Sequence, residues 1–198
     1  PPIVAVFIKI GYGLFQNELG VRLIFIVASM AMIYMLELLT QPKRVLYFYL
    51  AITSIGAFHF LGLLALPDMP LLLFSTLYLY LYKSYLKNDG LLTSILLTVT
   101  IVLMLLSKYH GILVILFTII AYPAIFKRRS FWLIALGSIL LFIPHIHWQI
   151  THDFPSIKYH FFERSPLPYK IEFTLNYLVS TLLMFSPIVG IVLAWHAI

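Results

Sequence analysis

A short polar segment, Ser107-Lys108-Tyr109-His110-Gly111, separates two apolar runs and contains the residue best suited to bind an anion. The Lys108 ammonium is a compact positive charge with three hydrogen-bond donors, which suits a phosphate group. Gly111 permits a tight reversal of the chain. Lys108 could instead be a lysine that extends from a helix end to the headgroups, with Tyr109 as an interfacial aromatic residue. We predict that Lys108 and Tyr109 bind a phosphate-bearing substrate.

A carboxylate lies between two prolines at the start of another apolar run, in Pro67-Asp68-Met69-Pro70. Two interpretations remain open. Asp68 can cap the helix that follows, because a carboxylate accepts hydrogen bonds from the free N–H groups of a helix start. Alternatively, Asp68 lies at a cavity rim, where it binds a sugar hydroxyl, a metal ion or a cationic partner.

A third polar segment extends from Trp148 to Lys170 and includes His152-Asp153. This pair could provide a metal ligand or an acid–base pair, although a histidine in a polar loop is more often only solvated. His145 and His147 lie inside the preceding apolar run, where we expect hydrogen bonds to other helices. His152 and Asp153 are therefore further candidates for substrate binding.

Arg22 lies near the start of the first long apolar run, four residues after Glu18. Its guanidinium matches the geometry of phosphate oxygens, so Arg22 is a candidate partner of Lys108, although interfacial placement also explains it. Asp68 and His152 are the candidate ligands for a divalent metal ion, and the sequence does not decide whether a metal is needed. The chain has no cysteine and no glycine-rich nucleotide-binding motif.

The segments that must position these residues are long apolar runs. A hydrocarbon core of about 30 Å needs roughly 17–25 apolar residues in each spanning helix. We therefore predict an all-α, polytopic transmembrane bundle, formed as a single domain over residues 1–198. Residues 1–15 are expected to form an interfacial helix. The predicted spans, about seven in number, are residues 19–40, 45–66, 69–86, 91–106, 111–126, 131–149 and 172–195.

The composition supports a membrane protein. Hydrophobic residues make up 62% of the 198 positions and charged residues only 10%. A soluble domain carries about 25% charged residues, so this chain could not form an ordinary water-facing surface. The net charge of +6 does not indicate a nucleic-acid partner, because the basic residues lie in short clusters between apolar runs.

The turns between the predicted spans alternate in charge. One set is short and basic, and the positive-inside rule places it in the cytoplasm; it comprises residues 41–44, 83–89 and 127–129. The other set then faces the periplasm or the lumen and comprises residues 67–68, 107–111 and 151–170. A span of 16 residues covers only about 24 Å, so Lys108 is expected to lie in a polar recess below the outer surface.

Five motifs in this order resemble the polytopic glycosyltransferases related to protein O-mannosyltransferases and lipid A aminoarabinose transferases. The resemblance extends from the first residues to about residue 165. The motifs are Pro1-Pro2, Glu18-Leu19-Gly20-Val21-Arg22-Leu23, Leu66-Pro67-Asp68-Met69-Pro70-Leu71, Leu106-Ser107-Lys108-Tyr109 and His152-Asp153-Phe154-Pro155-Ser156-Ile157-Lys158-Tyr159.

The resemblance implies a GT-C fold and an inverting transferase in the cell envelope. Its donor would be a polyprenyl-phosphate sugar, and its acceptor a lipid, a glycan or a protein. The protein would be a multi-pass protein of the bacterial inner membrane. Lys108, with Arg22, would neutralise the donor phosphate. Asp68 and His152 would line the same cavity.

In such relatives, an outer loop that ends in a Pro-Pro pair carries the acidic catalytic residue. Since this chain opens on Pro1-Pro2, we expect the general base upstream and no activity from residues 1–198 alone. A secondary transporter or a flippase is the alternative. Transporters typically show internal repeats and polar sites near the bilayer midplane, and neither is evident here.

Overall fold

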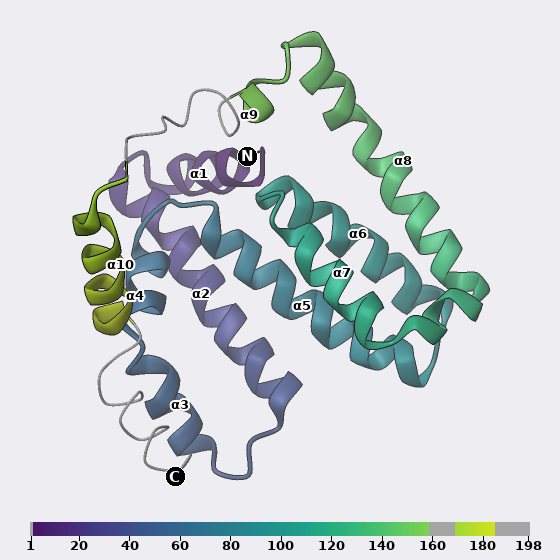
Figure 1. Ribbon diagram of the computed structural model, residues 1–198, viewed down its shortest axis with the longest axis horizontal. Coiled ribbons are helices and arrows are strands. Elements are labelled where there is room, and N and C mark those ends of the chain that lie inside the picture. Colours follow the sequence, from purple (N-terminus) through teal and green to yellow (C-terminus); the bar gives the residue numbers. More distant parts are fainter. Residues whose placement is uncertain (1, 159–168, 185–198) are drawn as a thin grey trace.

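The computed structural model describes residues 2–158 and 169–184, and within these ranges every regular element is a helix (Figure 1). The all-α prediction is therefore confirmed for the described part of the chain. The elements are α1 (Pro2–Phe15), α2 (Glu18–Thr40), α3 (Val45–Thr53), α4 (Gly56–Leu63), α5 (Asp68–Lys87), α6 (Leu91–Ser107), α7 (Gly111–Ala121), the 3₁₀ helix η1 (Pro123–Lys127), α8 (Arg129–Thr151), α9 (Pro155–Lys158) and α10 (Ile171–Met184).

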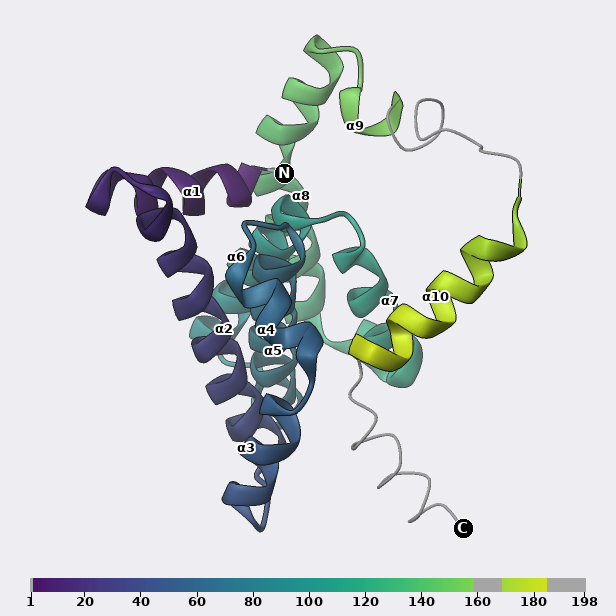
Figure 2. The ribbon, with the colours of Figure 1, turned by 90° about the vertical axis from the view of Figure 1, so that its left-hand side faces the viewer.

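Helices α2, α5, α6 and α8 pack in that order as the centre of the bundle, each against the next. Their contacts bury large apolar side chains, including Phe25 of α2, Met69 and Tyr85 of α5, and Met104 of α6, all of which are inaccessible to solvent. Helix α1 lies crosswise to α2, at the end of the bundle where α2 begins (Figure 2). The packed centre fixes the positions of the helix ends that carry the candidate site.

Local sequence signals set the ends of α2. The side chain of Asn17 caps its first turn, because Asn17 Oδ1 accepts a hydrogen bond of 2.9 Å from the Gly20 N–H. Glu18 places a negative charge in that turn, where the helix dipole stabilises it. The helix ends at Thr40, and the cap residue that follows, Gln41, adopts the left-handed conformation with φ of 49°.

Two of the predicted spans fall on helices long and apolar enough to cross a membrane, α2 and α8, each of 23 residues. A third candidate is the pair α3–α4, which covers the predicted span 45–66 but bends by 67° at its break. The ring Nε2 of His59 lies 2.6 Å from the Thr53 carbonyl oxygen, near this break. Length and composition thus identify two spans, or three with the bent pair, among the described residues, against about seven expected.

The remaining predicted spans correspond to other helices. Residues 69–86 fall within α5, and 91–106 within α6, which has 17 residues. The range 111–126 is shorter as an α-helix than expected, because α7 ends at Ala121 and η1 follows. Helix α10 begins the range 172–195, and residues 185–195 lie outside the described residues.

Basic side chains at the opposite end of the bundle from α1 close the carboxyl ends of two helices. Arg128 donates from Nη1 to the Tyr85 carbonyl at 2.6 Å and from Nη2 to the Leu86 carbonyl at 2.7 Å. Lys83 Nζ donates to the Leu39 carbonyl at 2.8 Å. These last-turn carbonyls have no hydrogen-bond donor within their own helix, so the basic side chains supply one. Their positive charges also interact favourably with the negative end of the helix dipole.

We expect Arg128→Lys to destabilise the protein by about 1–2 kcal/mol, because an ammonium cannot reproduce the two-pronged contact of the guanidinium. The measurement is the melting temperature of the purified protein in detergent. Arg129→Lys is the matched control, since the Arg129 side chain makes no hydrogen bond among the described residues. Equal shifts for the two variants would contradict the role given to Arg128.

Candidate functional site

The charged centre of the candidate site is an ion pair between Asp68 and Lys108. Lys108 Nζ donates to Asp68 Oδ1 at 2.6 Å. About a third of each side chain is exposed, 31% for Lys108 and 36% for Asp68. The sequence singled out both residues, and the structure brings them together although they are 40 positions apart.

Helices α5 and α6 are consecutive and packed together, so the first residue of α5 lies beside the last turn of α6. Asp68 begins α5 and Lys108 is the carboxyl cap of α6, positions at which the helix dipoles favour a negative and a positive charge respectively. The interpretation of Asp68 as a capping residue is wrong, because Pro67 holds the cap position and no side chain bonds the first turn. Its carboxylate is instead bonded to Lys108.

The pair leaves hydrogen-bonding capacity on the lysine. An ammonium has three N–H donors, and the bond to Asp68 is the only side-chain hydrogen bond of Lys108 among the described residues. An anionic oxygen that approaches the exposed face of Lys108 can therefore bind without first displacing Asp68. Neither of the two described cavities is lined by Lys108, so the polar recess expected around it stays a prediction.

Tyr109 belongs to a polar cluster that joins the α6–α7 turn to α8. Its hydroxyl accepts a hydrogen bond of 2.6 Å from Gln149 Nε2 and lies 2.8 Å from His145 Nε2. His145 thus bonds the turn before α7 and not another helix, and the His147 side chain makes no hydrogen bond among the described residues. Gln149 was missed, although its spacing of four residues from His145 places both on one face of a helix.

His152 ends α8 in an aromatic stack and does not approach Lys108 through any described contact. Its ring stacks on Trp148 with centroids 4.5 Å apart, and its Nδ1 lies 2.9 Å from the Trp148 carbonyl oxygen. Asp153 follows in the left-handed conformation with φ of 57°. The described residues contain no group of three or more His, Cys, Asp or Glu side chains placed to hold a metal ion.

Arg22 is paired with its own helix. Its Nη2 lies 3.7 Å from Glu18 Oε2, and both side chains are largely exposed, 51% for Arg22 and 91% for Glu18. Exposed pairs of this kind contribute about 0.3–0.5 kcal/mol. Figure 1 shows that α2 begins on the side of the bundle where α5 also starts. A joint role of Arg22 and Lys108 in binding one phosphate stays a prediction.

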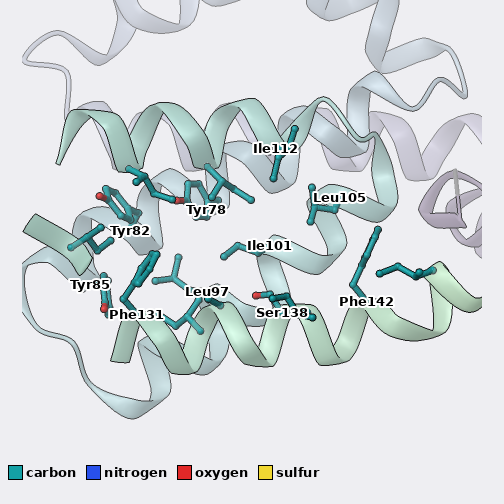
Figure 3. A pocket seen from close by; sticks show the side chains of 17 residues that line it. Tyr78, Tyr82, Tyr85, Leu97, Ile101, Leu105, Ile112, Phe131, Ser138 and Phe142 are labelled. Atoms are coloured by element: carbon teal, nitrogen blue, oxygen red, sulfur yellow. The ribbon is translucent and has the colours of Figure 1, made fainter. Parts of the chain in front are cut away.

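An apolar groove lies beside this site, between α7 and α8, with a volume of about 270 Å³ (Figure 3). Phe142 and Ile146 line one end of it, and Phe142 also contacts the ring of His145 at a centroid distance of 5.1 Å. The groove therefore adjoins the Tyr109 cluster at one end.

The arrangement combines three kinds of group at one end of the bundle. A positive charge in an ion pair can bind an anion, a carboxylate can accept hydrogen bonds from hydroxyl groups, and the Tyr109 cluster offers hydroxyl, imidazole and amide groups. These are the groups that an anionic, hydroxyl-rich substrate requires.

Comparison with known proteins gives one informative result. Neither the curated proteins nor the solved structures include a match to this chain. Residues 1–148 match the family described as dolichyl-phosphate-mannose-protein mannosyltransferase. The match contains Asp68, Lys108, Tyr109 and His145 and ends before His152. Because it covers well over half of the residues, the chain belongs to the dolichyl-phosphate-mannose-protein mannosyltransferase family.

Proposed function

We propose that this membrane glycosyltransferase of the mannosyltransferase type takes its sugar from a polyprenyl-phosphate donor and inverts the anomeric carbon. The acceptor is a lipid, a glycan or a protein on the periplasmic or luminal face. The Asp68–Lys108 ion pair carries this proposal, because it places a partly exposed ammonium at one end of a helical membrane bundle.

The proposed role of Lys108 follows from the chemistry of the leaving group. In the transfer, the bond between the anomeric carbon and the phosphate oxygen breaks, and its electron pair stays on that oxygen. The acceptor oxygen attacks from the opposite face and loses its proton to a general base. A cation close to the phosphate stabilises the charge that develops on it. Lys108 provides that cation, and Asp68 orients it.

The remaining predicted residues take supporting roles. Tyr109, held by His145 and Gln149, is placed to bind a sugar or acceptor hydroxyl. Three further candidates have no described contact with Lys108 and would contact the substrate only where it extends toward them: Arg22, His152 and Asp153. A divalent metal ion is not required by these roles.

The charge of the turns supports the choice of face. The basic turns after α2 and α5 and at η1 lie at the opposite end of the bundle from α1 (Figures 1 and 2). By the positive-inside rule, this end with the basic turns is cytoplasmic. The Asp68–Lys108 pair then faces the periplasm or the lumen. In a bacterium this corresponds to the inner membrane, with the site on its outer face.

The test is sugar transfer by the full-length protein in proteoliposomes. Radiolabelled mannose is supplied on a polyprenyl phosphate or on a nucleoside diphosphate, with an extract of the cell envelope as acceptor. We expect label in product only from the lipid-linked donor. Transfer from the nucleotide-linked donor would contradict the donor class. Movement of the intact donor between leaflets without transfer would favour a flippase, and solute uptake would favour a transporter.

A further inference from the structure

The apolar groove between α7 and α8 exists because these helices scarcely touch each other. Helix α7 packs on α5 and α6, and α8 packs on α6, so the two stand apart across the α5–α6 surface. Side chains from all four helices and η1 point into the space between them (Figure 3). Leu97, Ile101 and Ile134 form part of its wall and are themselves buried.

The wall offers little to a polar ligand. The hydroxyl of Tyr78 is bonded to Thr118 Oγ1 at 2.6 Å, and that of Tyr85 to Ser130 Oγ at 2.7 Å. Ser138 Oγ is buried and makes no hydrogen bond within the described ranges. An apolar cavity of about 150 Å³ is large enough for a benzene molecule, so about 270 Å³ accommodates a segment of hydrocarbon chain.

One end of the groove adjoins a basic turn. Tyr85, Ile125 and Phe131 line that end, and Lys127 and Arg129 lie two residues from Ile125 and Phe131. Both basic side chains belong to exposed residues, and neither forms an ion pair with any described residue. The Arg128 guanidinium donates to two α5 carbonyls, so it is less free than Lys127 and Arg129 to bind an anion.

One acidic residue, Asp89, contacts Ser130 beside this turn but does not neutralise it. Asp89 Oδ2 accepts a hydrogen bond of 3.0 Å from Ser130 Oγ and forms no ion pair with any described residue. Lys127, Arg128 and Arg129 therefore leave a local excess of positive charge beside the end of the groove.

Aromatic side chains mark the depth of this end in a bilayer. The rings of Phe126, Phe131 and Trp132 contact one another at centroid distances of 5.2 to 6.0 Å. Trp132 is 58% exposed, and its indole N–H donates to the Phe126 carbonyl at 3.1 Å. Tryptophan and basic side chains together are typical of the headgroup level. The basic end of the groove is therefore expected at the depth of the lipid phosphates.

We infer that the α7–α8 groove binds an anionic glycerophospholipid, with one acyl chain in the groove and the phosphate on Lys127 and Arg129. Charge complementarity selects this occupant, because basic residues beside the membrane attract anionic lipids. The proposed sugar donor would bring its phosphate to Lys108, at the other end of the bundle. The phospholipid site is therefore separate from the transfer site and does not depend on the proposed function.

The experiment places the full-length protein in nanodiscs doped with a lipid that carries a photoreactive diazirine on its acyl chain. The probes are phosphatidylglycerol and phosphatidylcholine with identical chains, and cross-linked residues are identified by mass spectrometry. We expect labelling of groove residues such as Ile115 and Ile139 to be at least about three-fold higher with phosphatidylglycerol, because basic side chains at the headgroup level attract the anionic lipid.

Two pairs of variants locate the lipid. Lys127→Gln with Arg129→Gln should reduce labelling by phosphatidylglycerol to the level of phosphatidylcholine, whereas Lys43→Gln with Arg44→Gln, in the basic turn after α2, should not. Ala135→Phe fills the groove and should remove labelling by both probes. Leu136→Phe is its control, because Leu136 is 55% exposed and does not line the groove. Size-exclusion chromatography confirms that each variant is folded.

Three results would overturn the inference. Equal labelling by the two probes in the unaltered protein would show that the headgroup is not selected. Groove labelling that survives Ala135→Phe would place the acyl chain elsewhere. Cross-links from groove residues to another segment of this chain or to a second copy would show that protein, not lipid, covers the groove.

Discussion

Lys108→Ala in the full-length protein is expected to lower sugar transfer from a polyprenyl-phosphate donor by about 100- to 1,000-fold, the usual cost of removing one group that stabilises a developing oxyanion. The measurement is the initial rate of transfer in proteoliposomes at saturating donor. Lys87→Ala is the matched control, because Lys87 ends the same helix that Asp68 begins and its side chain makes no hydrogen bond among the described residues.

Asp68→Asn separates a chemical role of Lys108 from a structural one. If the ion pair only joins α5 to α6, the two substitutions should lower the melting temperature equally, and activity should follow the folded fraction. A pair that is one-third exposed contributes about 1 kcal/mol at most, so both proteins should still fold. With a chemical role, Asp68→Asn keeps the ammonium and should retain at least about ten times the activity of Lys108→Ala. Normal transfer by Lys108→Ala would exclude the proposed phosphate contact.

The pairing of these two residues lay within reach of the sequence. The predicted spans 69–86 and 91–106 are consecutive, nearly equal in length and joined by a short turn, so they must run antiparallel with the start of one beside the end of the other. Asp68 and Lys108 flank that hairpin. The nearly equal lengths of the two helices therefore predict that Asp68 and Lys108 lie close together, whereas their role in binding a substrate stays a prediction.

The Tyr109 cluster could not be predicted in the same way. It depends on which face of α8 turns toward the α6–α7 connection, and α8 is apolar on nearly every face. A helix without a marked polar side has no periodic signal from which its rotation can be deduced. The groove between α7 and α8 has the same origin, because it results from two helices that do not meet. The bend between α3 and α4 was not predicted either, because no proline lies at the break.

The family match covers some of the candidate site residues and not others. The matched residues 1–148 include the ion pair and Tyr109 with His145, so these residues are the ones to which family membership lends weight. His152 and Asp153 lie outside the match and outside any described contact with Lys108. Their predicted role therefore rests on the sequence motif alone.

Gly11→Ala is expected to destabilise the protein by about 3 kcal/mol and to reduce transfer with it. Helices α1 and α2 cross at Gly11 and Gly20, where a Cβ on either residue would overlap the carbonyl oxygen of the other. A backbone carbonyl cannot rotate away as a side chain can, so α1 must move. Because α1 also contacts α6, which ends beside Lys108, its displacement should disturb the ion pair.

Gly13→Ala tests whether the effect belongs to the helix crossing or to α1 as a helix. A Cβ at Gly13 meets no atom within 4 Å, and alanine favours a helix over glycine by about 1 kcal/mol. Gly13→Ala should therefore leave the melting temperature unchanged or raise it, whereas Gly11→Ala should lower it by several degrees. If the two substitutions change the melting temperature equally, the close approach of α1 to α2 is not what fixes the position of α1. The proposed effect of α1 on Lys108 through α6 would then also be wrong.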